Sequence, residues 1–394
     1  MNEFVYYSPT KVIFGKGAES AAGSEINKLG AKKVLIHYGG GSVVRSGLLD
    51  RVQNSLAQSG ISYITLSGVK PNPVLSLVRK GISMCREENV DLILAVGGGS
   101  VIDSAKAIAV GAANPDTDVW DYFLRKATPV NRLPVAVILT IAASGSEMSN
   151  SCVITNEDGM LKRGFSSDAN RPVVSFMNPE LLKTVPRYHR GCGVTDILMH
   201  TLDRYFTSRL GNELTDQFAE GLLRTVIKYG EKYVSDPSDY EAASEIMWAG
   251  SVSHNDLTGL GGEGDFATHR LSHELSAMFD KAHGAALSAI WGSWARHVYK
   301  NNPARFKRYA QNVWGINNGD DDSLAIQGIE QTELYFKKIG MPVNIVELIG
   351  RPLSEDELNT VSLKCTWNNT VMLGSFKKLD RDECLEIYKK ANRA

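Results

Sequence analysis

The sequence is poor in the features that mark secreted, membrane or nucleic-acid-binding proteins. Cysteine is scarce and scattered, and no Cys-x-x-Cys pair occurs among Cys85, Cys152, Cys192, Cys365 and Cys384. An odd, dispersed set excludes a disulfide framework and predicts reduced thiols that pack as small apolar side chains. No uninterrupted apolar run approaches the roughly 20 residues that a membrane span requires.

An excess of one charge is also missing. The chain has 43 Lys and Arg against 44 Asp and Glu, for a formal net charge of −1. This balance gives no electrostatic reason to expect nucleic acid or an anionic membrane as a partner. The first residues, Met1 to Pro9, lack the basic and then apolar pattern of a secretory signal, so we expect a cytoplasmic protein. A length of 394 residues predicts two domains.

The first half of the chain alternates apolar strands with amphipathic helices. Strands are predicted at 33–38, 62–66, 91–96 and 134–139, with helices between them. This alternation predicts a parallel sheet that is covered on both faces, as in α/β proteins. Residues 4–14 predict an edge strand or a hairpin. An unpaired edge favours pairing with a second copy, so we expect a homodimer.

Loops of small residues close three of these strands, where parallel sheets collect their ligands. They span 39–42, 97–100 and 140–146. Glycines let a phosphate approach the backbone, and a following helix offers unpaired N–H groups. Ser100-Val-Ile-Asp103 has the pattern of a capping box that would fix such a helix start. The loop at 97–100 is neither the G-x-G-x-x-G fingerprint nor a Walker A loop. One such loop alone can be a tight turn, but three of them predict a dinucleotide site.

The first loop bears on the choice of coenzyme. Dinucleotide folds that prefer NAD hold the adenine ribose with an acidic side chain. Residues 39–42 offer no carboxylate, and Arg45 lies just beyond them. This pattern favours NADP(H) over NAD(H).

After Pro186 the strand-like runs become rare and helical patterns continue to the end of the chain. The predicted helices span about 189–208, 212–235, 239–258, 266–278, 284–301, 303–314, 321–338, 355–363 and 380–392. We therefore predict an α/β domain over residues 1–188 that binds a dinucleotide, followed by an all-α domain over residues 189–394.

Histidines gather in the helical half near one carboxylate. Asp196 and His200 are four residues apart, which places both on one helix face, although an ordinary surface pair has the same spacing. His269 and His273 repeat this spacing, whereas a straight helix would put His283 about 21 Å from His269 unless the chain reverses between them. Spacing alone does not choose between His273 and His283. One carboxylate with two or three imidazoles suits Fe²⁺ or Zn²⁺. We predict surface or satisfied core positions for three other histidines, His37, His189 and His297.

Several motifs together resemble the iron-containing alcohol dehydrogenase family, and the loop at 38–42 is similar to its butanol-dehydrogenase-like branch. The motifs are Gly97–Lys106, Pro71-Asn72-Pro73, Thr140–Glu147, Asp196-x-x-x-His200 and His269-x-x-x-His273-x₉-His283-Gly284. They follow the family's order and spacing from about residue 3 to the C-terminal helices. The resemblance implies a Rossmann-like N-terminal domain and an all-α, metal-binding catalytic C-terminal domain, together the dehydroquinate synthase-like fold.

The resemblance also implies roles for individual positions. The family's metal ligands match Asp196, His200, His269 and His283, and His273 matches a non-ligand histidine near the nicotinamide. Coenzyme contacts match Gly39, Gly40, Ser42, Asn72, Gly97, Gly98, Gly99, Ser100, Asp103, Thr140, Ser149, Lys162 and Leu181.

Three positions depart from the family pattern. Ser149 stands where Thr or Asn is usual, and Asp203 stands where Glu is common after the first ligand histidine. His254 lies, with Asn255, where apolar residues often line the pocket. We therefore expect His254 to face the substrate, which counts against a simple alkanol.

The expected reaction is reversible hydride transfer between NAD(P)H and an aldehyde or a primary alcohol, with a divalent ion as Lewis acid. We expect His273 to relay a proton or to orient the nicotinamide. One alternative is a lyase of the dehydroquinate-synthase type that uses NAD transiently. That reaction needs a pocket dense in Lys and Arg, whereas Arg270 and Lys281 are the scattered bases near the ligands. A non-catalytic regulator is the other alternative, but it would not need four ligand positions with three phosphate loops.

Overall fold

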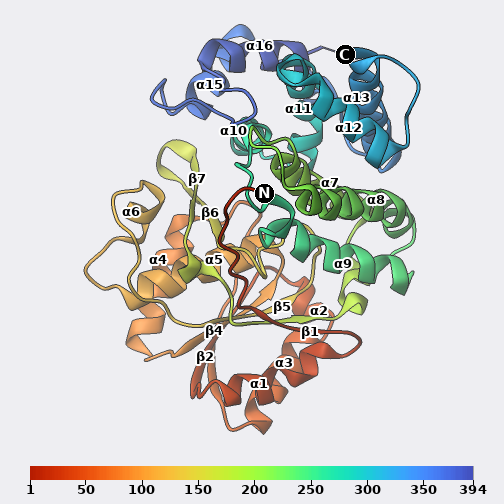
Figure 1. The fold of residues 1–394 in the computed structure, drawn as a ribbon. Coiled ribbons are helices and arrows are strands. Elements are labelled where there is room, and N and C mark those ends of the chain that lie inside the picture. Colours follow the sequence, from red (N-terminus) through yellow and green to blue (C-terminus); the bar gives the residue numbers. More distant parts are fainter. Residues whose placement is uncertain (394) are drawn as a thin grey trace. The chain divides into compact units, whose positions relative to one another are not determined.

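The computed structural model describes residues 1–393, and the chain forms two compact units (Figure 1). Tyr7–Thr184 make up the first, here called the α/β unit. The second, the helical unit, combines Met1–Tyr6 with the chain from Val185 onward. Within the helical unit, Asn2 donates hydrogen bonds from its backbone N–H to the Oδ1 of Asn212 (2.7 Å) and from its amide to the carbonyl oxygens of Leu210 (3.2 Å) and Gly261 (3.0 Å).

The α/β unit is built on one six-stranded sheet in the order β1-β8-β5-β4-β2-β3, in which every neighbouring pair is parallel. The four strands predicted in this half are present. Of residues 4–14, only the last four form a strand, and this strand is the edge of the sheet and not part of a hairpin. The strands are β1 (Lys11–Phe14), β2 (Lys33–Tyr38), β3 (Ser62–Leu66), β4 (Leu92–Gly97), β5 (Val135–Leu139) and β8 (Val174–Met177).

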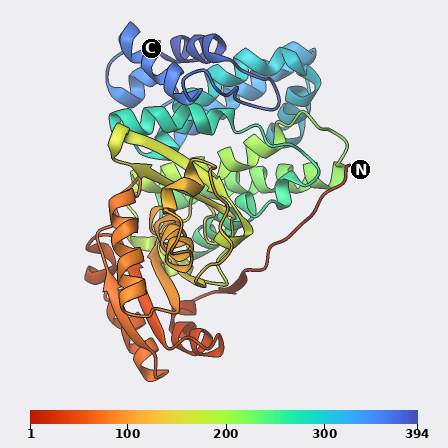
Figure 2. The ribbon, with the colours of Figure 1, turned by 90° about the vertical axis from the view of Figure 1, so that its left-hand side faces the viewer.

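Helices cover both faces of this sheet (Figures 1 and 2). On one face, Ile26 and Val52 from two helices pack with Leu94 of β4 in a fully buried cluster. On the other face α5 packs against β4 and is itself covered by α4. β4 and β5 are buried at every position because helices cover both faces of the sheet. Strands in such a position have apolar side chains throughout. The helices are α1 (Ala22–Lys28), α2 (Ser42–Arg45), α3 (Leu48–Gln58), α4 (Leu75–Glu87), α5 (Gly99–Ala113) and α6 (Val119–Phe123).

Besides the strand β8 and the short helix α6, which were not predicted, two further features of this unit differ from the sequence-based expectation. A short antiparallel hairpin, β6 (Ser151–Asn156) with β7 (Leu161–Ser166), lies outside the main sheet and was not predicted. Its Thr155 N–H donates to the carbonyl oxygen of Pro73 (2.8 Å), which ties the hairpin to the turn after β3. The capping box expected at Ser100–Asp103 is wrong, because α5 begins at Gly99 and no side chain caps it.

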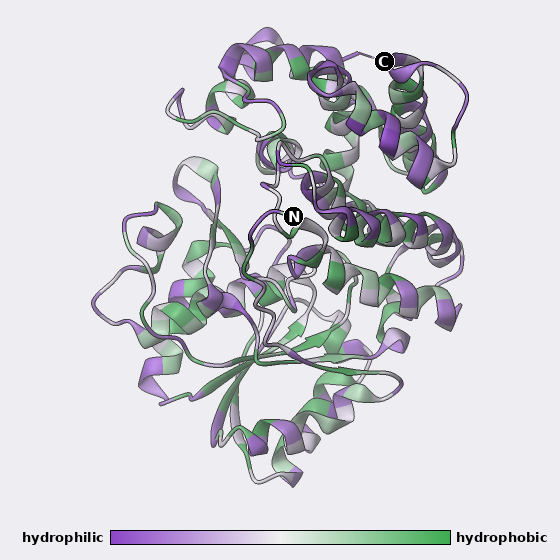
Figure 3. Ribbon diagram, in the orientation of Figure 1, coloured by the Kyte–Doolittle hydropathy of each residue, from purple (hydrophilic) through white to green (hydrophobic). Residues whose placement is uncertain are grey.

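The helical unit contains every helix predicted for the second half, with ends that differ by a few residues. A short helix, α14, was not predicted. Figure 3 shows apolar residues concentrated along the sheet and polar residues on the outer helices. The helices are α7 (Arg187–Tyr205), α8 (Glu213–Ser235), α9 (Tyr240–His254), α10 (Ala267–Phe279), α11 (His283–Val298), α12 (Pro303–Trp314), α13 (Asp321–Lys338), α14 (Ile345–Ile349), α15 (Glu355–Cys365) and α16 (Arg381–Ala391).

Aromatic packing holds the centre of the helical unit. The Phe206 ring, directly after α7, stacks on Phe306 of α12 with centroids 4.3 Å apart and meets Trp294 of α11 at 5.8 Å. All three side chains are fully buried. Burial of aromatic rings in such contacts stabilises the positions of the helices that carry them. Among the described residues, none of the helices combines the length and the apolar character that crossing a membrane would demand.

Candidate metal centre and coenzyme loops

Helix α7 presents the first two candidate ligands on the same face. Asp196 and His200 are one helical turn apart, and both side chains are buried. The Oδ1 of Asp196 lies 3.5 Å from the Nε2 of His200. The i, i+4 spacing read from the sequence therefore does bring the two groups together.

Two further imidazoles approach the same carboxylate oxygen. His269 on α10 and His283, the first residue of α11, place their Nε2 atoms 3.8 Å and 3.7 Å from the Oδ1 of Asp196. The chain can return because α10 ends at Phe279 and Asp280 adopts a left-handed conformation (φ 49°), which starts the reversal into α11. His273 lies one turn further along α10, with its ring centroid 6.5 Å from that of His269.

These four donor groups fit a divalent cation. The Oδ1 of Asp196 and the Nε2 of His269 are buried without a hydrogen-bond partner. Leaving a carboxylate oxygen buried and unpaired is costly, so this arrangement calls for a cation at the point where the donor atoms converge. One ligand atom each from Asp196, His200 and His269 lie within 4.8 Å of one another. Nitrogen and carboxylate donors of this kind suit Zn²⁺ and Fe²⁺.

A buried carboxylate orients His269. The Nδ1 of His269 donates to the Oδ2 of Asp203 at 2.5 Å, and Asp203 is fully buried. Burial acts to lower the pKa of His269, but the carboxylates of Asp203 and Asp196 outweigh it and raise this pKa to about 9. The contact fixes the hydrogen on Nδ1 and turns Nε2 toward Asp196, and a cation at Nε2 would take the place of the second proton.

A second histidine stands behind His200. The Nδ1 of His200 lies 2.8 Å from the Nδ1 of His254, the last residue of α9. Arg204, one turn after His200 on α7, brings both terminal nitrogens within 3.5 Å of the same atom. Burial, followed by the nearby His254, holds the pKa of His200 well below its usual value, which favours the neutral, ligating form. Arg204 had no role in the sequence-based expectation, although its i, i+4 spacing from His200 was a usable signal.

The three small-residue loops end strands of the α/β unit. Gly97 is the last residue of β4, Gly98 is the N-cap of α5, and α5 begins at Gly99. A Cβ on Gly97 would lie 2.5 Å from the Val101 side chain, and one on Gly99 would lie 2.3 Å from the Oγ of Ser144. Both positions therefore leave little space for a side chain, and the first N–H groups of a helix such as α5 have no partner within the helix, which suits an anion.

Asp103 and Ser149 take part in a network that fixes the loop after β5. The Ser146 hydroxyl and the Val153 N–H donate to the carboxylate of Asp103 at 2.6 Å and 3.0 Å. The buried ammonium of Lys106 donates to the Ser146 hydroxyl (2.8 Å), to the Ser149 hydroxyl (3.3 Å) and to the carbonyl oxygens at 149 and 151 (3.1 Å and 2.8 Å). Lys106 was not singled out as a site residue, yet it anchors this loop.

The remaining coenzyme candidates occupy the surrounding turns. Lys162 on β7 donates to the Oδ1 of Asn72 at 2.9 Å. Thr140 follows β5 and its N–H bonds the Gly97 carbonyl oxygen (3.0 Å), while Leu181 packs against the core of the unit. The other candidates for coenzyme contacts follow β2: Gly39, Gly40 and Ser42, which is the first residue of α2.

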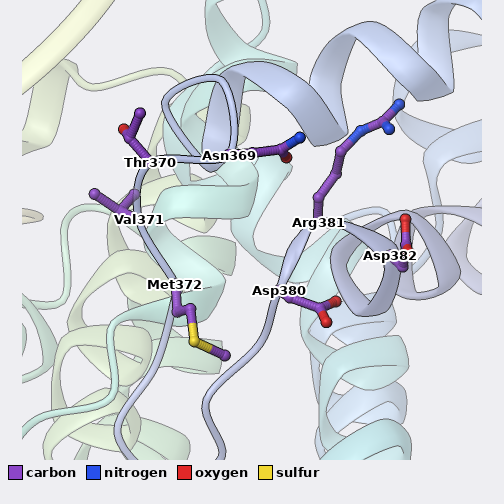
Figure 4. A pocket seen from close by; sticks show the side chains of 7 residues that line it. All are labelled: Asn369, Thr370, Val371, Met372, Asp380, Arg381 and Asp382. Carbon is purple, nitrogen blue, oxygen red and sulfur yellow. The ribbon is translucent and has the colours of Figure 1, made fainter.

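A surface pocket elsewhere in the helical unit contains none of the candidate residues (Figure 4). It is lined by two short segments, 369–372 and 380–382, the latter at the start of α16. Its donors and acceptors come from exposed turns, and it does not include the converging donor atoms described above.

Family models match almost the whole chain. The model of the iron-containing alcohol dehydrogenases matches residues 9–179, and the model of the C-terminal part of the Fe-containing alcohol dehydrogenase family matches residues 192–392. The chain belongs to the iron-containing alcohol dehydrogenase family. This confirms the resemblance drawn from the motifs.

Relatives of this iron-containing alcohol dehydrogenase match it over its full length. The NADH-dependent butanol dehydrogenase A of Clostridium acetobutylicum is 40% identical over 99% of this chain and 100% of its own. The NADPH-dependent aldehyde reductase of Escherichia coli is 32% identical over 99% and 100%. The crystal structure of NADH-dependent butanol dehydrogenase A from Thermotoga maritima superposes with a TM-score of 0.95, at 37% identity, over 100% of this chain and 99% of that one.

These likenesses confirm the fold class, with a parallel α/β part followed by a helical part. The protein is an oxidoreductase that acts on alcohols or aldehydes with a nicotinamide coenzyme and a metal ion. The lyase alternative is not favoured, because the similar proteins are alcohol dehydrogenases and aldehyde reductases.

Proposed function

We propose that this alcohol dehydrogenase reduces aldehydes to primary alcohols, and oxidises such alcohols, at a metal site formed by Asp196, His200, His269 and His283. The observation that carries the proposal is the convergence of one unpaired carboxylate oxygen and three imidazole Nε2 atoms inside the helical unit. The domain that holds this site is proposed to be residues 189–394. Fe²⁺ and Zn²⁺ both suit these ligands.

The bound ion would act as a Lewis acid that polarises the substrate carbonyl and stabilises the alkoxide. Neighbouring residues of the chain orient the histidine ligands. Asp203 fixes the tautomer and the direction of His269, and the reversal at Asp280 brings the Nε2 of His283 to 3.7 Å from the Oδ1 of Asp196. His273 is half-buried, with its ring centroid 5.2 Å from that of His283. We propose that His273 relays a proton or orients the nicotinamide ring.

Residues 1–188 are proposed to bind the coenzyme. The N–H groups at the start of α5 and the glycines at 97–99 would receive the pyrophosphate, with Ser100 and Asp103 beside them. Thr140, Ser149 and Leu181, with the bonded pair Asn72 and Lys162, would surround the ribose and the nicotinamide. Gly39, Gly40 and Ser42 would contact the adenosine.

We propose that the loop after β2 favours NADP(H) over NAD(H). Residues 39–42 carry no carboxylate that would repel a 2′-phosphate, and the guanidinium of Arg45 lies over Gly41, 2.5 Å from where a Cβ would stand. The named relatives divide on this point, since the butanol dehydrogenases are NADH-dependent and the aldehyde reductase is NADPH-dependent. A measured ratio of rates is therefore required.

The natural substrate is proposed to be a butanol-like primary alcohol or its aldehyde, in line with the butanol dehydrogenases among the relatives. We also propose a cytoplasmic homodimer. The edge strand β1 has its outer side unpaired in the sheet order, and Phe14 at its end is 42% exposed. Such an edge is suited to pairing with a second copy.

The test is the initial rate of NADPH and of NADH oxidation with aldehydes from acetaldehyde to hexanal. Metal-stripped protein should be inactive, and reloading with Fe²⁺ or Zn²⁺ should restore net turnover. The variant Asp196→Asn should remain inactive after reloading, because the neutral amide cannot replace the carboxylate. Absence of net coenzyme oxidation with every aldehyde, metal and coenzyme would contradict the proposal, since a lyase returns its NAD unchanged.

A further inference from the structure

We propose that His254 is a positioning residue that fixes the ligating tautomer of His200, and that Arg204 makes this possible by restricting His254 to the role of hydrogen-bond acceptor. This inference rests on the metal site of the proposed function. It replaces the expectation that His254 faces the substrate, because its Nδ1 is directed to a candidate ligand and the side chain is buried.

The hydrogen on His200 can be assigned from its surroundings. Its Nε2 is 3.5 Å from the Oδ1 of Asp196, among the donor atoms that converge there, so Nε2 must be free of hydrogen to bind a cation. A neutral imidazole then carries its hydrogen on Nδ1. The 2.8 Å contact is therefore a hydrogen bond in which His200 Nδ1 donates and His254 Nδ1 accepts.

Arg204 supports the same assignment from another direction. A guanidinium has donors only and stays charged in proteins. Its Nη1 and Nη2 both lie 3.5 Å from the Nδ1 of His254, and its Nη1 donates to the backbone carbonyl oxygen of His200 at 3.0 Å. A hydrogen on the Nδ1 of His254 would point at one of these donors. The arrangement thus holds His254 in the neutral tautomer with its hydrogen on Nε2.

The position of Arg204 is itself well determined. It is 8% exposed, and its guanidinium lies over the Phe266 ring, 5.1 Å from the centroid. Its Nη2 also lies 3.5 Å from the Oδ1 of Asp256, which has a left-handed backbone (φ 77°). A cation held on several sides in this way cannot turn from His254 without losing other contacts.

Two candidate ligands therefore have outer partners of opposite character. His269 donates to the Asp203 carboxylate, which increases electron donation at its Nε2. His200 donates to a neutral imidazole that is backed by a cation, so its Nε2 is a weaker donor. A cation held by this set would be less neutralised than one held by two carboxylate-backed histidines, which favours Lewis acidity.

The test measures metal affinity and not only activity. Metal-stripped wild type and the variants His254→Leu, His254→Gln and His189→Leu are titrated with Zn²⁺ against a chromophoric chelator. His254→Leu should bind Zn²⁺ about 10- to 100-fold more weakly, the usual effect of removing an outer partner. His254→Gln should stay close to wild type, because its amide oxygen can accept from His200. The exposed His189 supplies the matched control, and its variant should not change the affinity.

Co²⁺ in place of Zn²⁺ provides a spectroscopic readout of the same geometry. We expect the visible absorption bands of the His254→Leu complex to shift and those of His254→Gln to match wild type. Equal loss of affinity in both variants would overturn the proposal, since shape and not hydrogen bonding would then matter. Unchanged affinity with a raised KM for the aldehyde would also overturn it and return His254 to the substrate pocket. Failure of wild type to bind any divalent ion would instead overturn the proposed function along with this inference.

Discussion

Adding a single methyl group at Gly284 should weaken Zn²⁺ binding at the metal centre. Gly284 is the second residue of α11, directly after His283, and it packs against the backbone of α7. A Cβ at this position would lie 2.1 Å from the carbonyl oxygen of Cys192, 2.6 Å from its carbonyl carbon and 2.7 Å from its Cα. These are backbone atoms of a buried helix, so a side-chain rotation cannot relieve the overlap.

The size of the effect follows from these distances. Going from 2.1 Å to the 3.4 Å at which ordinary contact begins requires a movement of about 1.3 Å between α11 and α7. Asp196 lies one turn after Cys192 on α7, so the same movement separates it from His283. Metal sites tolerate deviations of roughly 0.2 Å in ligand distance. We therefore expect Gly284→Ala to lose at least tenfold in Zn²⁺ affinity and about 1–3 kcal/mol in the free energy of unfolding.

Two measurements check this prediction, chelator competition for Zn²⁺ affinity and urea denaturation for stability. Gly221→Ala on α8 is the matched control, because the atom nearest to its Cβ would be an Arg224 nitrogen at 3.9 Å. That variant should keep its metal affinity and gain about 0.5–1 kcal/mol from the helix preference of alanine. If Gly284→Ala bound Zn²⁺ as tightly as wild type, the helix contact would not control the ligand geometry and the reasoning would be refuted.

Three further predictions concern other buried charges. Lys106→Met should lower the free energy of unfolding by about 3–5 kcal/mol in urea denaturation, because the oxygens at 146–151 lose their buried donor. The same change should weaken coenzyme binding and leave Zn²⁺ affinity unchanged. The control for stability is Lys183→Met, which removes an exposed ion pair. Asp203→Asn should weaken Zn²⁺ binding about 10- to 100-fold in chelator competition, and an unchanged affinity would exclude its role at His269. Burial, and then the charge of Asp203, raise the pKa of Asp265 from 3.8 to about 7. The folded state therefore binds this proton more tightly than the unfolded state does. The stability that the bound proton contributes is lost as the pH rises from about 4 to 7. Relative to wild type, metal-stripped Asp265→Asn should gain up to about 4 kcal/mol over that pH range in urea denaturation, and a pH-independent difference would contradict the shift.

The parts of the fold that the sequence predicts well are those in which periodicity and burial agree. The run at 91–96 is apolar after Asp91, and the run at 33–38 is apolar except at Lys33 and His37, as is typical of strands that are covered on both faces. The missed hairpin carries Lys162 and Arg163 on β7 and lies outside the main sheet, so its strands lack that signal. The strand β8 has only four residues and follows Pro172, which made it too short to recognise.

In the candidate site, contacts within one helix could be predicted from the sequence, whereas contacts between distant segments could not. Asp196 and His200 follow from helix periodicity, because both lie on α7. The approach of His283 depends on a left-handed Asp280, a conformation that residue type does not dictate. The contact of His254 with His200 joins residues 54 positions apart, and only the packing of α9 on α7 brings it about. Local patterns carry no record of such contacts, so the pairing of His254 with His200 could not be predicted.

The membership of Met1–Tyr6 in the helical unit has a consequence for how that unit can be obtained. Asn2 supplies donors to Leu210, Asn212 and Gly261 across separations of 208, 210 and 259 residues. During synthesis these contacts must wait until the chain has passed residue 261, after the whole α/β unit has been made. A fragment that starts at Val185 would leave those acceptors without their donors. Fragments or fusions of the helical half should therefore preserve the first six residues.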